Sequence, residues 1–250
     1  MSTDEIRILF GEERKDIELN NIYNINCFDG MKQIEDKSIN CIVTSPPYNL
    51  GGDFHTFVDG KRVTYGDYEG FKDKIPEKQY KEEQIELLNE CYRILTDDGY
   101  MFYNHKNRII KGSISSPLEW IFQTKWNISQ IVVLDFGASA NVDKRRFFPV
   151  HELLFVLNKN PSLKLHNDQC LTDVWKMKKV PRKESGHPAT FHIDLPTRCI
   201  LASTKENDIV FDPYSGTGTT CRAAKDNNRR FLGFEIGDLY CEMSKNRIAI

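Results

Sequence analysis

Two consecutive prolines stand between a hydroxyl and an aromatic ring in Ser45-Pro46-Pro47-Tyr48, directly after the apolar run Cys41–Thr44. Each proline fixes one φ angle and removes one amide donor, so the backbone here is stiff and can neither extend a strand ladder nor begin a helix. A hydroxyl and an unpaired carbonyl can accept both protons of an exocyclic NH2 group while an aromatic ring stacks on the heterocycle. The tetrapeptide therefore suits a planar ring that carries an amine, although a Pro-Pro pair alone more often marks an ordinary loop.

A second stretch has the composition of a ligand-binding turn. Residues 209–220 read Ile-Val-Phe-Asp-Pro-Tyr-Ser-Gly-Thr-Gly-Thr-Thr, a short strand followed by a turn in which Gly216 and Gly218 allow the backbone to approach a ligand closely. Helical sequence follows at once, so the turn would present free amides at a helix N-terminus beside the end of a strand.

Three classes of ligand use such a turn, and the residues distinguish them. A nucleotide triphosphate site would need a lysine where Gly218 is followed directly by Thr219. A dinucleotide fingerprint would need a third glycine near position 221, which is Cys221. S-adenosylmethionine is favoured, because Asp212 at the strand end complements an ammonium group better than a pyrophosphate. Glu235, which ends the next strand, could accept both ribose hydroxyls.

These motifs occur in the order found in one known family. The chain resembles the β group of DNA amino-methyltransferases, in which a Ser/Asp-Pro-Pro-Tyr motif precedes the cofactor motif. It departs from that family at Asn26 and Asn40, where Asp is common, and at Tyr214, where Phe is usual. The resemblance runs from about Ile22 to the C-terminus and is carried by Ile22–Cys27, Ser45–Asn49, Asn104–Lys106, Arg146–Glu152, His187–Phe191, Asp212–Thr220, Phe231–Glu235 and Tyr240.

The resemblance implies a Rossmann-like α/β fold of the S-adenosylmethionine-dependent methyltransferases, with a seven-stranded, mostly parallel sheet and helices on both faces. It implies that Ser45-Pro46-Pro47-Tyr48 is the catalytic segment, which accepts the amine hydrogens and stacks on an extruded base. Such a transfer needs positioning and polarisation but no covalent enzyme nucleophile. The expected cofactor-binding residues are Asn26, Cys27, Thr190, Phe191, Asp212, Pro213, Tyr214, Ser215, Gly216, Gly218, Thr219, Thr220, Glu235 and Ile236.

The methylated amine would be N4 of cytosine or N6 of adenine. Within the family, Ser at the first motif position is more like the N4-cytosine enzymes and Asp more like the N6-adenine enzymes, so Ser45 favours cytosine. A hydroxyl is both donor and acceptor, however, and by itself excludes neither base. The less favoured alternatives are a methyltransferase of RNA or of a protein glutamine, and a nucleotide-binding module without catalysis.

Contact with DNA must depend on local basic patches, because the net charge of the chain is −2. Gly51–Pro76 is a long segment without a clear strand or helix, which is typical of a lid or binding element. Asn158–Gly186 is the expected target-recognition insert. A solvated surface would explain any one basic cluster about equally well. The expected DNA-binding residues are Asn49, Lys61, Arg62, Lys144, Arg145, Arg146, Lys178, Lys179 and Arg182.

Short apolar runs alternate with helical patterns, which predicts seven strands in one parallel sheet. Ligands of such sheets bind beyond the carboxyl ends of the strands, so the Ser45 and Asp212 turns would meet in one cleft. His151-Glu152 is interpreted as the start of a strand rather than a catalytic dyad. The predicted strands are Ile22–Ile25, Cys41–Thr44, Tyr100–Tyr103, Ile131–Asp135, Glu152–Leu157, Ile209–Phe211 and Phe231–Glu235, and the predicted helices are Glu77–Leu95, Pro117–Thr124, Leu195–Thr204, Thr219–Asn228 and Asp238–Ala249.

The length of 250 residues suits one methyltransferase domain, since no Gly/Ser linker, composition break or repeat divides the chain. Within it we expect a catalytic half at 22–157, the recognition insert at 158–186 and a cofactor half at 187–250. Seven cysteines without paired spacing predict reduced thiols, and the histidine spacing gives no metal site.

The chain lacks an apolar run of membrane-spanning length, and its acidic start is unlike a signal peptide, so we expect a cytoplasmic protein. The resemblance implies double-stranded DNA as the main partner. A homodimer and a cognate restriction endonuclease are further expected partners.

Overall fold

The structure, a computed structural model, describes the chain outside residues 1–4, 11–12, 51–53, 59–60, 66, 69–70, 138–144, 167–170, 179, 181–189 and 250. For residues 5–10, 13–17, 54–58, 61–65, 67–68 and 71–72 it describes the backbone only. Among the helices in the described ranges, none has the length and apolar character that crossing a membrane requires.

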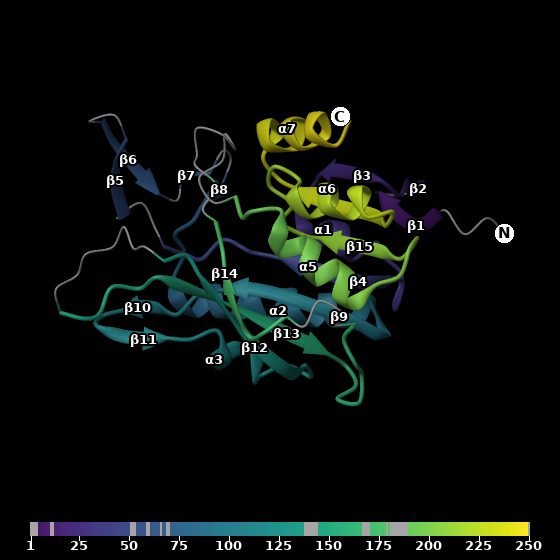
Figure 1. Cartoon of the computed structure of the whole chain (residues 1–250). Helices are drawn as coiled ribbons and strands as arrows, with labels where there is room; N and C mark the ends of the chain where they lie inside the picture. Colours follow the sequence, from purple (N-terminus) through teal and green to yellow (C-terminus); the bar gives the residue numbers. More distant parts are fainter. Residues whose placement is uncertain are drawn as a thin grey trace.

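Eight strands form the central sheet, in the order β14-β12-β13-β9-β4-β15-β16-β3 (Figure 1). β13 is antiparallel to its neighbours β12 and β9, and the other neighbouring pairs are parallel. The strands are β3 (Asn21–Asn24), β4 (Ile39–Thr44), β9 (Leu95–His105), β12 (Asn127–Asp135), β13 (His151–Asn158), β14 (Val174–Lys176), β15 (Ile209–Asp212) and β16 (Arg230–Glu235).

Helices cover both faces of the sheet, because successive strand residues point to opposite sides. In β4, Ile42 belongs to one apolar cluster, whereas Cys41 and Val43 belong to the other. The first cluster is covered by α1 (Cys27–Met31), α2 (Glu77–Ile94) and α3 (Leu118–Ile121). The second is covered by α5 (Asp194–Ser203), α6 (Thr219–Asp226) and α7 (Asp238–Ala249), which lie together in Figure 1.

All seven predicted strands and all five predicted helices are present; α7 has the predicted bounds and the others have shifted bounds. The eighth strand, β14, was missed because it has three residues and only Trp175 in it is buried. The short helix α1 was also missed.

Among the described residues, four hairpin pairs outside the sheet were not predicted. The expectation that Gly51–Pro76 contains no strand is wrong, since its described part forms two short hairpins. The strands β7, β8, β10 and β11 have only two or three residues each, too few to show an alternating pattern. The pairs are β1 (Glu5–Phe10) with β2 (Glu13–Glu18), β5 (Phe54–Val58) with β6 (Lys61–Tyr65), β7 (Asp67–Tyr68) with β8 (Phe71–Lys72), and β10 (Arg108–Ile110) with β11 (Ser113–Ser115).

One edge of the sheet collects the segments that carry the sequence motifs. The parallel strands β4, β9, β15 and β16 all end there. β13 begins at the same edge, because it runs antiparallel to β9 and pairs its Leu153 with His105. The topology therefore brings the start of β13 beside the Ser45 turn, which sequence spacing alone does not indicate.

Candidate active site

The Ser45–Tyr48 rim follows β4 and is fixed by hydrogen bonds at both ends. Tyr80, on α2, donates from its hydroxyl to the Pro47 carbonyl at 2.9 Å. The Ser45 and Tyr48 hydroxyl oxygens lie 2.9 Å apart. The Tyr48 hydroxyl is also 3.2 Å from Asn104 Oδ1 and 3.1 Å from Glu152 Oε2. The rigid backbone expected from the two prolines thus carries side chains that are themselves held in place.

His105, the last residue of β9, lies against the Tyr48 ring, with centroids 4.5 Å apart. The Tyr80 hydroxyl, which donates to the Pro47 carbonyl, also lies 2.6 Å from His105 Nε2. His105 Nδ1 lies 2.8 Å from both the backbone nitrogen and the carbonyl oxygen of Lys106. Burial lowers the pKa of His105 to about 3. The imidazole is therefore a neutral, oriented support for the Tyr48 ring.

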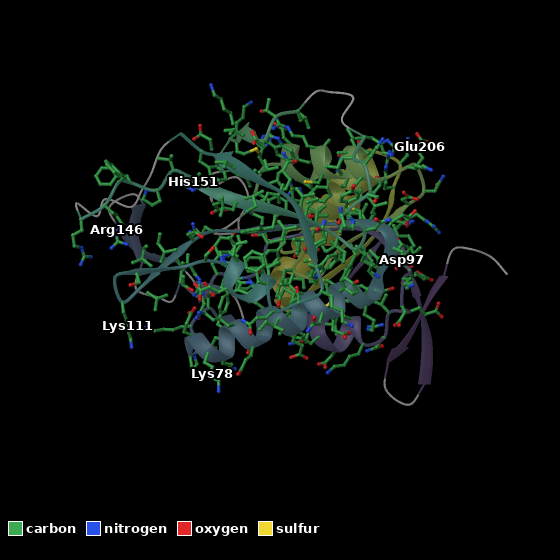
Figure 2. The ribbon with its side chains drawn as sticks, turned by 90° about the horizontal axis from the view of Figure 1, so that it is seen from below. Lys78, Asp97, Lys111, Arg146, His151 and Glu206 are labelled. Carbon is green, nitrogen blue, oxygen red and sulfur yellow. The ribbon has the colours of Figure 1, made fainter. Side chains whose placement is uncertain are left out.

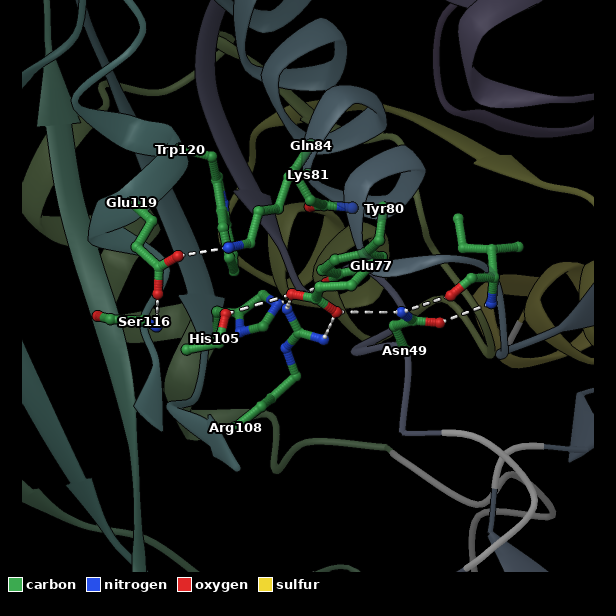
Figure 3. Close-up of polar contacts among 12 residues, drawn as sticks. Asn49, Glu77, Tyr80, Lys81, Gln84, His105, Arg108, Ser116, Glu119 and Trp120 are labelled. Atoms are coloured by element: carbon green, nitrogen blue, oxygen red, sulfur yellow. Dashed lines mark hydrogen bonds and ion pairs between the residues drawn. The ribbon is translucent and has the colours of Figure 1, made fainter. Parts of the chain in front are cut away.

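Asn49 ends the rim in a left-handed conformation with φ of 54°. Its amide group exchanges hydrogen bonds with the Ile75 backbone, donating to the carbonyl at 3.0 Å and accepting from N–H at 2.8 Å. Its backbone N–H donates to Asp73 Oδ1 at 2.6 Å. Figure 3 shows this exchange beside the first turn of α2. The structure thus gives Asn49 a bracing contact within the chain, and its expected contact with DNA stays a prediction.

Buried Arg108 forms an ion pair with half-buried Glu77 close to the Asn49 side chain (Figure 3). The Arg108 guanidinium has a 1% exposed side chain and donates to both Glu77 oxygens, at 2.8 and 2.7 Å. It also lies 4.4 Å from the Tyr80 ring centroid, a cation–π distance. The planar guanidinium fixes the start of α2 and the ring that holds the Pro47 carbonyl.

The glycine-rich turn joins β15 to α6 and is closed by a carboxylate. Gly218 precedes the helix with φ of +77°, a conformation that glycine adopts without strain. Glu235, at the end of β16, accepts from the amides of Gly216 and Gly237, each at 2.8 Å. Burial raises the pKa of Glu235. Because each carboxylate oxygen has a second lone pair, Glu235 can still accept from a ligand.

Asp212 lies beneath the glycine-rich turn, and its side chain is almost fully buried at 1% exposure. The Tyr214 amide donates to its Oδ1 at 3.0 Å. Burial raises the pKa of Asp212 to about 6, although the hydroxyls of Thr220 and Thr44 oppose the shift. A carboxylate in this position acts on a ligand through its charge and through the shape of the turn.

The start of α1 lines the same cavity as the glycine-rich turn. Asn26 caps that helix by accepting from the Phe28 amide at 2.9 Å. Burial raises the pKa of the Cys27 thiol to about 12, so this side chain is a neutral part of the wall. Thr190 places its hydroxyl 3.4 Å from that of Thr217, in the glycine-rich turn.

A single cavity of about 700 Å³ connects the rim with the glycine-rich turn. Among the expected cofactor-binding residues, Asp212, Gly218 and Thr220 are buried behind its lining rather than part of it. The expected residues that do line it are Ser45, Pro46, Pro47, Tyr48, Asn26, Cys27, Thr190, Phe191, Pro213, Tyr214, Ser215, Gly216, Thr219, Glu235 and Ile236.

Several lining residues were not predicted as site residues. Lys106 places Nζ 5.2 Å from the Tyr48 ring centroid, and Glu152 reaches the Tyr48 hydroxyl. Glu152 does start a strand, as interpreted, but it also enters the cavity. The Asn104–Lys106 motif was the one available signal for Lys106. Nothing in the sequence near Glu152 indicates its distance from Ser45, because only the antiparallel order of β9 and β13 brings them together.

The basic residues expected to contact DNA are only partly described. Lys178 lines the cavity, and Arg145 and Arg146 precede β13. Arg146 lies on the same side of the molecule as Lys111, at the tip of the β10–β11 hairpin (Figure 2). The side chains of Lys61 and Arg62, in β6, and the residues Lys144, Lys179 and Arg182 lie outside the described residues.

A mostly parallel α/β sheet that brings a glycine-rich turn and a Pro-Pro-Tyr rim to one cavity is the arrangement expected of a methyltransferase. The model of the N6/N4 DNA methylase family matches residues 39–246. The chain is 30% identical to the type II methyltransferase M.HpaI of Haemophilus parainfluenzae, over 89% of this chain and 72% of that protein. The chain therefore belongs to the DNA methylase family, whose members transfer a methyl group from S-adenosylmethionine.

Solved structures of low sequence identity share the fold. The PvuII DNA methyltransferase (cytosine-N4-specific) superposes with a TM-score of 0.73 at 16% identity, covering 90% of this chain and 85% of that chain. TTHA0409 from Thermus thermophilus, in complex with S-adenosyl-L-methionine, gives a TM-score of 0.66 at 18% identity, covering 92% and 93%. These similarities confirm the predicted Rossmann-like fold class. The predicted family is confirmed by the match to the family model and by the similarity to M.HpaI.

Proposed function

We propose that this enzyme moves a methyl group from S-adenosylmethionine to the exocyclic amine of a base extruded from double-stranded DNA, and that the base is cytosine. The observation that carries the proposal is the single cavity of about 700 Å³, lined at one end by Ser45 and Tyr48 and at the other by Gly216 and Glu235. A cavity of this volume is within the range that small-molecule sites occupy.

The residues around the glycine-rich turn fit the methyl donor. Glu235 is held by two amides and keeps lone pairs for a pair of hydroxyl groups. The neutral side chains of Cys27, Tyr214 and Phe191 supply apolar wall, and Asp212 supplies buried negative charge that suits a cation. When bound, S-adenosylmethionine would supply an activated methyl group on a sulfonium.

The rim residues fit an exocyclic amine. Ser45 Oγ and the Pro46 carbonyl would accept the two amine hydrogens, which aims the nitrogen lone pair away from them and into the cavity. Tyr48 would stack on the base with its ring, and such a contact is worth about 1–3 kcal/mol per base. His105 supports the ring through its 4.5 Å contact.

Cytosine is favoured by a hydrogen-bond donor beside the rim, the ammonium group of Lys106. Lys106 Nζ lies near Tyr48 and has three protons to give. The Watson–Crick edge of cytosine carries two acceptors, N3 and O2, next to its amine, whereas adenine carries N1 followed by a C–H group. Ser45 in the first motif position supports the same choice through the family resemblance. N6 of adenine remains the second candidate.

The test is transfer of labelled methyl from S-adenosylmethionine to mixed-sequence duplex DNA, followed by digestion and mass spectrometry of the nucleosides. N4-methylcytosine would support the proposal in full. N6-methyladenine would keep the reaction and refute the choice of base. Label on RNA or protein alone would refute DNA as the substrate, and donor binding without transfer to any of these would indicate a module without catalysis.

A further inference from the structure

Glu152 lines the cavity and belongs neither to the rim nor to the residues assigned to the methyl donor. Glu152 is the second residue of β13, and its side chain is 24% exposed. Its Oε2 lies 3.1 Å from the Tyr48 hydroxyl oxygen, and its Oε1 lies 4.0 Å from Lys106 Nζ. Glu152 therefore contacts the rim without reaching across to the glycine-rich turn.

Two neighbours of the Tyr48 hydroxyl, Asn104 Oδ1 and the Glu152 carboxylate, face it as hydrogen-bond acceptors. Asn104 donates from Nδ2 to the Leu153 carbonyl at 3.2 Å, so its Oδ1 faces Tyr48 as an acceptor. The Glu152 carboxylate is likewise only an acceptor. Tyr48 must therefore give its single proton toward one of these two groups, and the charged carboxylate is the stronger partner.

Ser45 is a third neighbour of this hydroxyl, with its oxygen 2.9 Å away. Because the Tyr48 proton points toward Glu152, Ser45 must donate its own proton to Tyr48. A hydrogen-bond relay then runs from the Ser45 hydroxyl through the Tyr48 hydroxyl to the Glu152 carboxylate. This order leaves Ser45 Oγ with lone pairs only on the side of the incoming amine, which is the polarity that an acceptor of an amine hydrogen needs.

We propose that Glu152 takes up, through Tyr48 and Ser45, the proton that the target amine loses on methylation. The inference rests on the proposed function. The amine nitrogen forms the new N–C bond with its lone pair, the electrons of the broken C–S bond stay on sulfur, and the N–H electrons return to nitrogen as the proton leaves. That proton passes to Ser45, the Ser45 proton passes to Tyr48, and the Tyr48 proton passes to Glu152.

The charges balance once the proton has moved along the relay to Glu152. A sulfonium, a neutral amine and a carboxylate become a thioether, a neutral methylated amine and a carboxylic acid, so no charge is left on the base or on either hydroxyl. Glu152 is partly exposed, so its proton can be returned to solvent before the next cycle. Lys106, 4.0 Å away, stabilises the carboxylate that is restored.

A double-mutant cycle tests whether Tyr48 and Glu152 act in one relay. The substitutions chosen keep the shape of the side chains they replace. We would measure the single-turnover rate of labelled methyl transfer to mixed-sequence duplex DNA for the wild type, Glu152→Gln, Tyr48→Phe and the double variant. Each single change is expected to slow transfer on the order of a hundredfold, the scale of one proton-transfer group. The double variant should be no more than about threefold slower than the slower single variant, since both changes interrupt the same proton relay.

Rates that multiply in the double variant would show that the two residues act separately and would overturn the proposal. A rate within about threefold of wild type for Glu152→Gln would overturn it as well. The matched control is Glu206→Gln, which removes one carboxylate on a distant part of the surface (Figure 2) and should leave the rate unchanged. A wild type that transfers no methyl to DNA would instead refute the proposed function, and the inference with it.

Chemical rescue distinguishes a proton acceptor from a structural contact. Formate should accelerate Glu152→Ala, where the missing carboxylate leaves space, but not Glu152→Gln, where the space is filled. Affinity for S-adenosylmethionine, measured by calorimetry, should be the same in all variants because Glu152 lies at the rim end of the cavity. Absence of rescue, or a parallel loss of donor affinity, would show a structural role and contradict the proposal.

Discussion

Asp212 is expected to lower the stability of the fold at neutral pH while raising affinity for the methyl donor. Burial raises its pKa from 3.8 to about 6, a difference that corresponds to about 3 kcal/mol. A carboxyl whose pKa is raised in the folded state favours folding below its unfolded pKa, and this contribution is lost as the pH rises through the folded pKa. The folded state therefore carries this cost at pH 8.

The variant Asp212→Asn removes the charge and keeps an oxygen for the Tyr214 amide, which lies 3.0 Å away. The free energy of unfolding of this variant should exceed that of the wild type by up to about 3 kcal/mol at pH 8 and by roughly half as much at pH 5. Its affinity for S-adenosylmethionine should fall about tenfold, because one nearby negative charge is lost.

Urea unfolding at pH 5 and pH 8, with calorimetric titration of S-adenosylmethionine at pH 8, measures both effects. The control is Asp208→Asn, a change at a partly exposed carboxylate outside the cavity lining, which should alter neither quantity by more than a few tenths of a kcal/mol. An Asp212→Asn variant that is less stable than wild type at pH 8, or that binds the donor equally well, would refute this reasoning.

Three further variants test the supports of the site. Tyr80→Phe should slow methyl transfer about tenfold with unchanged donor affinity, since the Pro47 carbonyl loses its hydrogen bond; an unchanged rate would contradict this. Arg108→Met should lower the free energy of urea unfolding by about 2–4 kcal/mol, because it removes a buried guanidinium that makes two hydrogen bonds to Glu77, whereas Lys81→Met, at a more exposed pair, should cost under about 1 kcal/mol. Gly218→Ala should weaken calorimetric donor binding and cost about 1–3 kcal/mol in unfolding, because φ is +77° there.

The sequence was sufficient for the architecture because the buried strands carry strong patterns. The run Cys41–Thr44 is apolar on both faces, as a strand covered by helices on both sides must be. The Ser45–Tyr48 rim and the Gly216 turn were recognisable because prolines and glycines restrict the backbone directly. Both therefore indicated which strand ends would form the site.

The sequence was insufficient where a role depends on the order of strands or on burial. Glu152 enters the site only because β13 lies antiparallel beside β9. Asp212 was expected to meet the donor directly, but it lies behind the lining because its neighbours Pro213 and Tyr214 form that part of the wall. Arg108 carried no sequence signal of a buried ion pair, since its partner Glu77 comes from the start of α2.

The central claim is that one end of the cavity holds the base and the other holds the methyl donor. The most direct test compares Tyr48→Ala with the wild type in both labelled methyl transfer to duplex DNA and calorimetric binding of S-adenosylmethionine. Transfer should fall by more than about a hundredfold, because the variant loses both the stacking ring and the hydroxyl between Ser45 and Glu152, while the dissociation constant of the donor stays the same. A variant that methylates DNA at the wild-type rate, or that loses donor affinity together with transfer, would contradict the claim.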